Sequence, residues 1–171
     1  MLALNETHMK TIPLTKGYSA IVDDEDYEEL SKHRWYWNNG YACRRNGGNS
    51  STTIVEYMHR RLLPPLTGKE IDHVNRNRLD NRRVNLRTCT RSQNMANKRH
   101  FKNNTLGYKG IFDLKQYRLR YYASLKVNGK QALIGGFDSP RTAALARDLW
   151  ARDLYGDFAD LNFTPIDTKA A

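Results

Sequence analysis

The alternation of apolar and polar residues is most regular between residues 117 and 127. Apolar side chains fall on one side and a basic and aromatic set falls on the other, as expected of a β-strand with one buried face. Asn128 and Gly129 are typical of a tight hairpin turn. We therefore predict a returning strand over residues 130–137 and a third strand over residues 108–113.

A helix is predicted directly after this sheet. Ser139 can cap its N-terminus, Pro140 fits the first helical position, and Gly156 marks its end. Small side chains along the helix let it lie close to the apolar face of the sheet, and these are Ala143, Ala144, Ala146 and Ala151. The opposite face of the sheet is then left open, basic and aromatic.

The N-terminal half predicts shorter elements. The patterns indicate two helices, over residues 25–32 and 58–63, and strands over residues 18–22, 34–37, 40–45 and 52–57. Residues 38–40, Asn-Asn-Gly, form a strong turn signal between two of these strands. The aromatic residues of this half are interpreted as a small core, with base stacking as the alternative, and they are Tyr18, Trp35, Trp37 and Tyr41.

The middle of the chain is polar. Residues 75–85 hold four Asn and four Arg and predict a loop, followed by a short extended stretch over residues 86–88. Ser92 is expected to cap a helix that reaches Arg99. The α+β chain is therefore divided into an N-terminal β-rich region, a second module, a linker and a C-terminal domain, over residues 1–57, 58–100, 101–106 and 107–164.

Positive charge is concentrated in that middle segment. The protein has 28 Lys and Arg against 18 Asp and Glu, a formal net charge of +10. Residues 59–130 hold 18 of the basic residues and 4 of the acidic ones. Such a concentration favours an anionic partner, because like charges repel one another. Nucleic acid fits better than a membrane, because the arginines alternate with Asn rather than with large apolar residues.

Composition also excludes several classes of protein. No apolar stretch is long enough for a transmembrane helix and no signal-peptide pattern is present, so we expect a cytoplasmic protein. Cys43 and Cys89 are the only cysteines. They are too few for a four-cysteine zinc site or a disulfide framework, and we interpret both as unreactive thiols.

Four polar residues follow one another in an order that suits phosphodiester hydrolysis. Asp72 and His73 come first, Asn85 lies 12 residues after His73, and Asn94 lies 9 residues further on. The oxygens of Asp72 and Asn94 can bind one hard divalent cation, Mg²⁺ or Mn²⁺. His73 can act as general base on the attacking water, and Asn85 can hold the loop that orients the imidazole.

Two alternatives near these residues stay open. Asn97 lies on the same helical face as Asn94 and could replace it as the ligand. His59 could contact phosphate, or it could serve packing or capping in an amphipathic segment.

Residues 59–98 resemble the HNH (ββα-metal) nuclease family, particularly the homing endonucleases of phages and introns. The matching stretches are M-H-R-R-L-L, I-D-H-V-N-R-N-R-L-D-N-R-R-V-N-L-R and S-Q-N-M-A-N-K. The resemblance implies that His73 takes the role of the first His, Asn85 that of the middle Asn, and Asn94 the last position. That last position departs from the family's literal His, and an amide there suits Mg²⁺ or Mn²⁺ better than zinc.

Residues 107–163 resemble the AP2/ERF DNA-binding domain, through G-Y-K-G-I-F, Y-A-S-L-K-V-N-G-K, L-I-G-G-F-D-S-P-R-T-A-A-L-A-R-D and Y-G-D-F-A-D-L-N-F. That family lays a three-stranded antiparallel sheet into the major groove, with the helix behind it. The resemblance implies DNA contacts at Lys109, Arg118, Arg120, Tyr122, Ser124, Lys126 and Gln131. Phe112 and Leu133 depart from the plant pattern, so the base preference of the plant factors is not carried over.

The combined expectation is a metal-dependent endonuclease for double-stranded DNA. It would use one divalent cation, with no small-molecule cofactor and no membrane partner, as a monomer or a homodimer. Arginines of the first module are expected to contact phosphates, and these are Arg76, Arg78, Arg82, Arg83, Arg87 and Arg91. A DNA-binding regulator without nuclease activity and an RNA-binding protein are the alternatives.

Overall fold

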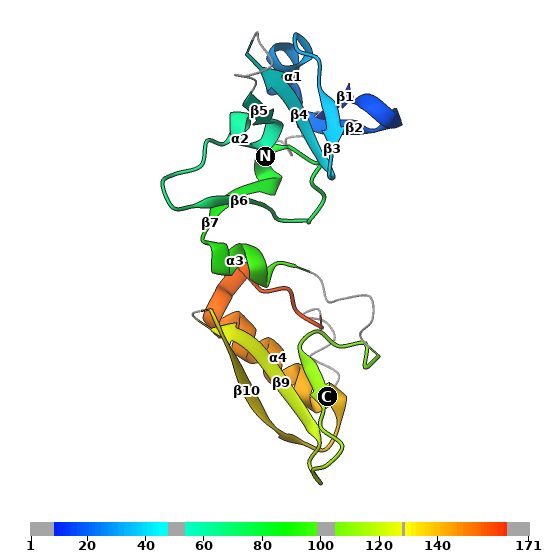
Figure 1. The fold of residues 1–171 in the computed structure, drawn as a ribbon, viewed down its shortest axis with the longest axis vertical. Helices are drawn as coiled ribbons and strands as arrows, with labels where there is room; N and C mark the ends of the chain where they lie inside the picture. Colours follow the sequence, from blue (N-terminus) through cyan, green and yellow to red (C-terminus); the bar gives the residue numbers. More distant parts are fainter. Residues whose placement is uncertain (1–8, 48–53, 99–104, 128, 164–171) are drawn as a thin grey trace, which may run out of the picture. The chain divides into compact units, whose positions relative to one another are not determined.

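A computed structural model describes the protein over residues 9–47, 54–98, 105–127 and 129–163 (Figure 1). The chain folds into two compact units, Met1–Cys89 and Thr90–Ala171. The module predicted over residues 58–100 contributes to both units, and most of the predicted linker lies outside the described residues. The domain bounds expected from the sequence therefore stay a prediction.

The first unit consists of short strands and helices. Its strands form three antiparallel sheets, in the orders β1-β2, β3-β4-β5 and β6-β7 (Figure 1). Short 3₁₀ turns lie at residues 15–17 and 83–85. The helices and strands are β1 (Met9–Pro13), β2 (Ser19–Asp23), α1 (Asp24–Ser31), β3 (Tyr36–Asn38), β4 (Tyr41–Asn46), β5 (Ile54–Tyr57), α2 (Met58–Leu62), β6 (Glu70–His73) and β7 (Leu86–Cys89).

The hairpin turn between β3 and β4 forms where the sequence predicts it. Asn39 and Gly40 both have positive φ, at 48° and 88°. Asn tolerates this left-handed conformation and Gly adopts it freely, which is why Asn-Gly favours such turns. The sequence pattern does not predict β1, which pairs with β2 from Met9 to Pro13.

The core of the first unit lies between α1, α2 and the strands. Trp35 is 2% exposed, and its indole Nε1 donates a hydrogen bond of 2.8 Å to the carbonyl oxygen of Leu30. Met58, at the start of α2, is fully buried in the same core. The predicted aromatic core is confirmed for Trp35 but is wrong for Tyr18, which is 45% exposed and stacks on Trp37.

The second unit is a three-stranded antiparallel sheet in the order β10-β9-β8, against which α4 packs (Figure 1). Its small apolar core joins the sheet to the helix through Ile111, Ala123, Ala143 and Ala144. In the described residues, the helices are all too short or too polar to cross a bilayer. The elements are α3 (Arg91–Ala96), β8 (Ile111–Asp113), β9 (Tyr121–Val127), β10 (Lys130–Phe137) and α4 (Pro140–Tyr155), followed by a 3₁₀ turn (Gly156–Phe158).

The predictions for β10 and α4 are confirmed. Ser139 caps α4 by accepting a hydrogen bond of 3.1 Å from the backbone N–H of Thr142, and Pro140 is the first helical residue. Gly156 ends the helix with a φ of 54°. Strong local signals therefore set both ends of this helix.

Three sequence predictions in this unit differ from the structure. The strand expected over residues 108–113 is shorter and consists of Ile111–Asp113. The strand expected over residues 117–127 begins only at Tyr121, because Arg120 pairs with Asp113 at 2.5 Å and closes the preceding residues into a loop. The cap of α3 is Thr90 rather than Ser92. Thr90 Oγ1 accepts from the backbone N–H of Gln93 at 3.2 Å, and Gln93 Oε1 accepts from that of Thr90 at 2.8 Å. These reciprocal bonds form a capping box.

Candidate active site

The hairpin of β6 and β7 carries Asp72 and His73. Asp72 lies directly opposite Arg87 and His73 opposite Leu86. Asp72 is 6% exposed, and its Oδ2 accepts hydrogen bonds from Arg87 Nε at 2.9 Å and Nη2 at 2.8 Å. Both bonds from Arg87 go to the same oxygen. Arg87 therefore fixes the orientation of the carboxylate rather than pointing away from the protein.

Asn85 closes the loop between these two strands. Its side-chain oxygen accepts from the backbone N–H of Asn75 at 2.9 Å, and its Nδ2 donates to the carbonyl oxygen of Asp80 at 2.7 Å. Its backbone oxygen accepts from Val74 N–H at 2.9 Å. Because Asn85 is buried, these bonds tie both ends of the loop beside His73.

Asp80 accepts hydrogen bonds from other residues of the loop, and the sequence pattern did not indicate this structural role. It is 2% exposed and binds Arg82 through both oxygens, at 2.8 Å to Nε and 2.7 Å to Nη2. Asn75 Nδ2 adds a third bond at 2.8 Å. The hydrogen bonds from Arg82 lower the pKa of the Asp80 carboxyl, although burial opposes them. The local signal was an Asp with an Arg two residues later in an Asn-rich loop.

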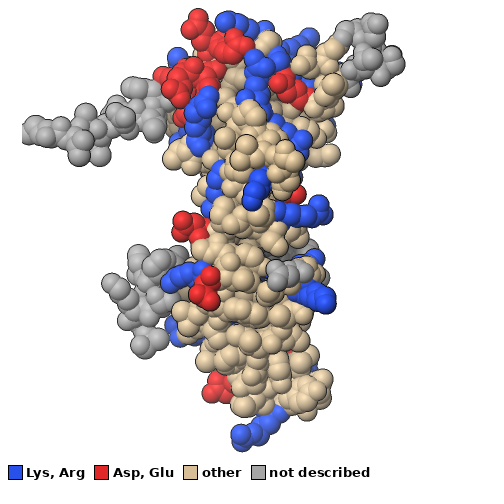
Figure 2. All heavy atoms as spheres, turned by 90° about the vertical axis from the view of Figure 1, so that its left-hand side faces the viewer, with Lys and Arg blue, Asp and Glu red and all other residues tan. Residues whose placement is uncertain are grey.

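The loop is also bonded to β2. Ile21 N–H donates to the carbonyl oxygen of Leu79 at 2.8 Å, and Asn81 N–H donates to that of Ile21 at 2.8 Å. Arg83 donates to both oxygens of Asp26 in α1, at 2.9 Å and 2.7 Å, and its own N–H donates to Asp23 Oδ2 at 2.7 Å. Figure 2 shows Asp and Glu gathered beside Lys and Arg on this unit.

A second histidine lies beside His73. The rings of His59 and His73 meet edge to face, with centroids 5.2 Å apart. Tyr41 lies 5.2 Å from His59 and 6.2 Å from His73, and Tyr57 lies 5.6 Å from His59. Arg78 lies over the Tyr41 ring at 4.6 Å. His59 thus packs in an aromatic cluster around His73, while a phosphate contact of His59 stays a prediction.

Both imidazoles are held in the neutral form. Burial lowers the pKa of His59 to about 3, and a proton on His73 would act in the same direction. Burial also lowers the pKa of His73, although its hydrogen bond with Asn81 opposes the shift. At neutral pH His73 is therefore in the form that can accept a proton, as a general base must.

Intramolecular contacts hold most of the arginines that the sequence places on phosphates. Ion pairs bind three of them within the first unit, and these are Arg82, Arg83 and Arg87. Arg78 donates to the carbonyl oxygen of Asn39 at 3.1 Å, and Arg76 has a positive φ of 65°. A DNA contact at any of these residues stays a prediction.

The second unit carries the remaining candidates for the metal site. Asn94 lies on α3 and is half-buried, and Asn97 is the buried C-cap of the same helix. Asp72, His73 and Asn85 are brought together in the first unit. Asn94 belongs to the other unit, so a cation shared by Asp72 and Asn94 stays a prediction. Carboxylate and amide oxygens are ligands of the kind that Mg²⁺ and Mn²⁺ prefer.

The predicted DNA-binding residues of the sheet have different environments. Arg118 is exposed, whereas Arg120 pairs with Asp113. Tyr122 lies over Gly135, where an added Cβ would be 1.8 Å from the ring. A cavity of about 590 Å³ in this unit gathers five of the predicted residues in its wall, and these are Arg91, Lys109, Ser124, Lys126 and Gln131.

Residues 54–96 match the HNH endonuclease family. The site is HNH-like. We call residues 54–96 the HNH segment; it runs from β5 to the end of α3 and contains all the proposed catalytic and metal-binding residues. An uncharacterized HNH endonuclease of Acanthamoeba polyphaga mimivirus is 29% identical over 150 residues, which are 86% of this chain and 76% of the viral protein. No solved structure matches the chain. The likeness of residues 107–163 to AP2/ERF domains stays a prediction.

Proposed function

We propose that the protein is a metal-dependent endonuclease that hydrolyses phosphodiester bonds in double-stranded DNA. The observation that carries this proposal is the buried, neutral imidazole of His73, next to the oriented carboxylate of Asp72 within the HNH segment. A neutral imidazole can take the proton of an attacking water, and a carboxylate is a ligand for a hard cation.

The chain's own residues have separate roles in this mechanism. His73 removes the proton from the water that attacks the phosphorus. Asn85 keeps the loop in place through its side-chain and backbone hydrogen bonds, so that the imidazole stays oriented. Asp72 and Asn94 are the proposed ligands of one Mg²⁺ or Mn²⁺, which when bound would neutralise charge that develops on the phosphate and the leaving oxygen.

The open face of β9 and β10 is the proposed DNA-reading surface. It carries exposed Lys126 and the hydrogen-bonded pair of Ser124 and Gln131, whose side chains meet at 2.7 Å. Polar side chains of this kind can contact base edges or phosphates. The first unit would then supply the general base and one metal ligand, and the second would supply Asn94 and most of the affinity.

The test is cleavage of supercoiled plasmid DNA with and without Mg²⁺ or Mn²⁺. The wild type should cut only with metal, and Asp72→Asn should not cut, because a neutral amide binds the cation more weakly. Asp153→Asn, an exposed position on α4, is the matched control and should cut normally. DNA binding without any metal-dependent cleavage would instead support a regulator.

A further inference from the structure

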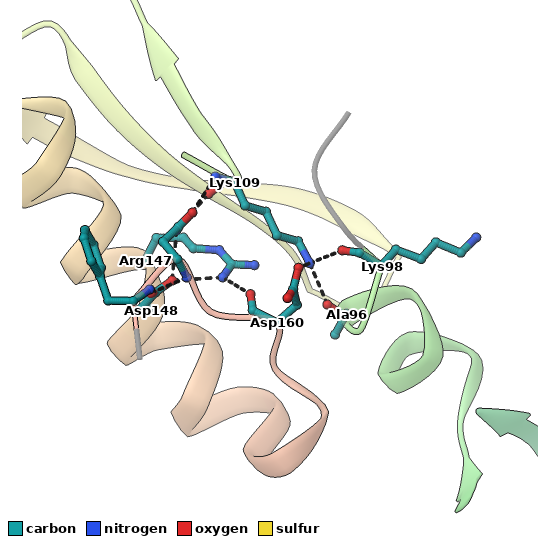
Figure 3. A network of polar contacts seen from close by, with 8 residues as sticks. Ala96, Lys98, Lys109, Arg147, Asp148 and Asp160 are labelled. Carbon is teal, nitrogen blue, oxygen red and sulfur yellow. Dashed lines mark hydrogen bonds and ion pairs between the residues drawn. The ribbon is translucent and has the colours of Figure 1, made fainter. Parts of the chain in front are cut away.

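Lys109, predicted from the sequence to contact DNA, is bound inside the second unit. Its Nζ donates to the carbonyl oxygen of Ala96 at 2.7 Å and to that of Lys98, and it pairs with Asp160 Oδ2 at 3.2 Å (Figure 3). The Lys109 and Asp160 side chains are 16% and 15% exposed. The three acceptors match the three donors of an ammonium group.

One of these acceptors is the carbonyl oxygen of Ala96, the last residue of α3, and another is that of Lys98, which directly follows the C-cap Asn97. The last carbonyl groups of a helix have no partners within it and carry partial negative charge. A lysine that binds such a carbonyl oxygen supplies the missing hydrogen bond and places a positive charge beside the partial negative charge. Lys109 therefore fixes this end of α3, while the capping box of Thr90 and Gln93 fixes the other end.

The fixation matters because α3 has only six residues. Isolated helices shorter than about 12 residues are marginal in water. Asn94, two residues before the end, has its backbone N–H bonded to the Thr90 carbonyl oxygen at 3.0 Å. The position of its side chain thus depends on how firmly both ends of the helix are held.

A buried polar network in turn holds Lys109. Its backbone N–H donates to Asn162 Oδ1 at 2.6 Å, and Asn162 N–H donates to Asp148 Oδ2 at 2.6 Å. Arg147, 2% exposed, joins Asp148 Oδ1 at 3.0 Å to the carbonyl oxygen of Asp160 at 2.6 Å. Figure 3 shows these contacts linking α4 to the end of α3.

We propose that Lys109 is a positioning residue for the nuclease, which fixes the helix that carries the metal ligand Asn94. The inference rests on the proposed function. It makes the C-terminal unit part of the catalytic apparatus rather than a DNA-binding attachment alone. Groups that orient metal ligands typically change metal affinity by about 10- to 100-fold when they are removed.

The decisive variant is Lys109→Met in the full-length chain, because methionine keeps the apolar stem and removes the ammonium. The concentration of Mn²⁺ that gives half-maximal plasmid cleavage should rise about tenfold. DNA affinity in EDTA should stay within twofold of wild type. Lys115→Met, an exposed lysine after β8, is the matched control and should change neither quantity.

Hydrogen exchange of the metal-free protein gives a readout that is independent of activity. In Lys109→Met, the amides of Asn94 and Asn97 should exchange faster, while those of Ala143 and Ala144 in α4 keep their protection. Lys109→Arg should restore part of the protection, because guanidinium N–H groups can also bind carbonyl oxygens. Loss of protection throughout α4 would overturn the proposal by showing a general structural role.

Other outcomes separate this inference from the proposed function. If the wild type cuts DNA and Lys109→Met keeps the same Mn²⁺ dependence, the inference alone is wrong. Weaker DNA binding in EDTA with unchanged Mn²⁺ dependence would make Lys109 a DNA contact, which also overturns it. If Lys109→Met does not fold, Asp160→Asn decides, with the same expected direction and the same criteria. A wild type that never cuts DNA overturns both proposals.

Discussion

The two units use positive charge in different ways. In the first, carboxylates hold arginines of the loop beside His73 and of β7, as Asp80 holds Arg82 and Asp72 holds Arg87. In the second, Lys126 stands exposed on the sheet, while Arg147 is buried in a polar network. A count of basic residues cannot tell these roles apart. The comparison indicates that arginines of the first unit mainly hold its own structure together, whereas Lys126 of the second is exposed; a DNA-binding role for the sheet stays a proposal.

The largest expected effect separates chemistry from binding. His73→Ala should lower the rate of plasmid cleavage by about 10²- to 10⁴-fold, because it removes the proposed general base. DNA affinity, measured by fluorescence anisotropy, should be unchanged. His33→Ala, on the first unit but away from the loop, is the control. A cleavage rate close to that of the wild type would remove His73 from the mechanism.

The buried charge of the second unit comes next. Arg147→Met should lower the free energy of unfolding by about 3 to 5 kcal/mol, because the Asp148 carboxylate would stay buried without its ion-pair partner. Urea titration followed by the NMR signals of Ala143 and Ala144 measures this unit directly. Arg152→Met, exposed on the same helix, should change stability little. Equal changes in the free energy of unfolding for the two variants would show that the buried network does not stabilise this unit more than an exposed arginine does.

Acid should weaken the first unit through His59. Its pKa is depressed to about 3 in the folded state, so the unfolded chain binds the proton more strongly, and stability is lost as the pH falls below about 6.5. The loss should reach about 2 kcal/mol at pH 5. His59→Phe should flatten this dependence. Urea unfolding at pH 7 and pH 5, followed by the fluorescence of Trp35 and Trp37 in a Trp150→Phe background, would reveal it. An equally steep dependence in the variant would contradict the prediction.

The smallest expected effect is on the salt dependence of DNA binding, and it tests whether the basic residues of the two units differ in their roles. Lys126→Ala should weaken DNA binding and lower the slope of log affinity against log salt by about 0.9, if it contacts one phosphate. Arg83→Ala should leave this slope unchanged, because Arg83 is bound to Asp26. Binding isotherms at several salt concentrations measure both. A reduced slope for Arg83→Ala would return the loop arginines to the DNA interface.

Local patterns predicted the elements with strong end signals and missed those set by distant partners. The bounds of α4 follow from Ser139, Pro140 and Gly156, which act within one or two turns. The loss of strand before Tyr121 depends on the Arg120–Asp113 ion pair, which alternation does not reveal.

The candidate site divides in the same way. The order of Asp72, His73 and Asn85 is visible in the sequence, but the packing of His59 against His73 is not, because it joins α2 to β6. The contact of Arg83 with Asp26 likewise spans 57 residues. Such long-range pairs require the folded chain.

The bonds of the loop to β2 and α1 also have a consequence for how the protein folds during its synthesis. The HNH segment begins at residue 54, yet Asn81 and Arg83 are bound by residues from positions 21 to 26. During synthesis, the residues at positions 21 to 26 therefore leave the ribosome well before the loop that binds to them. A fragment reduced to the HNH segment would lack these residues of β2 and α1. We therefore expect that the loop beside His73 does not adopt its structure in such a fragment.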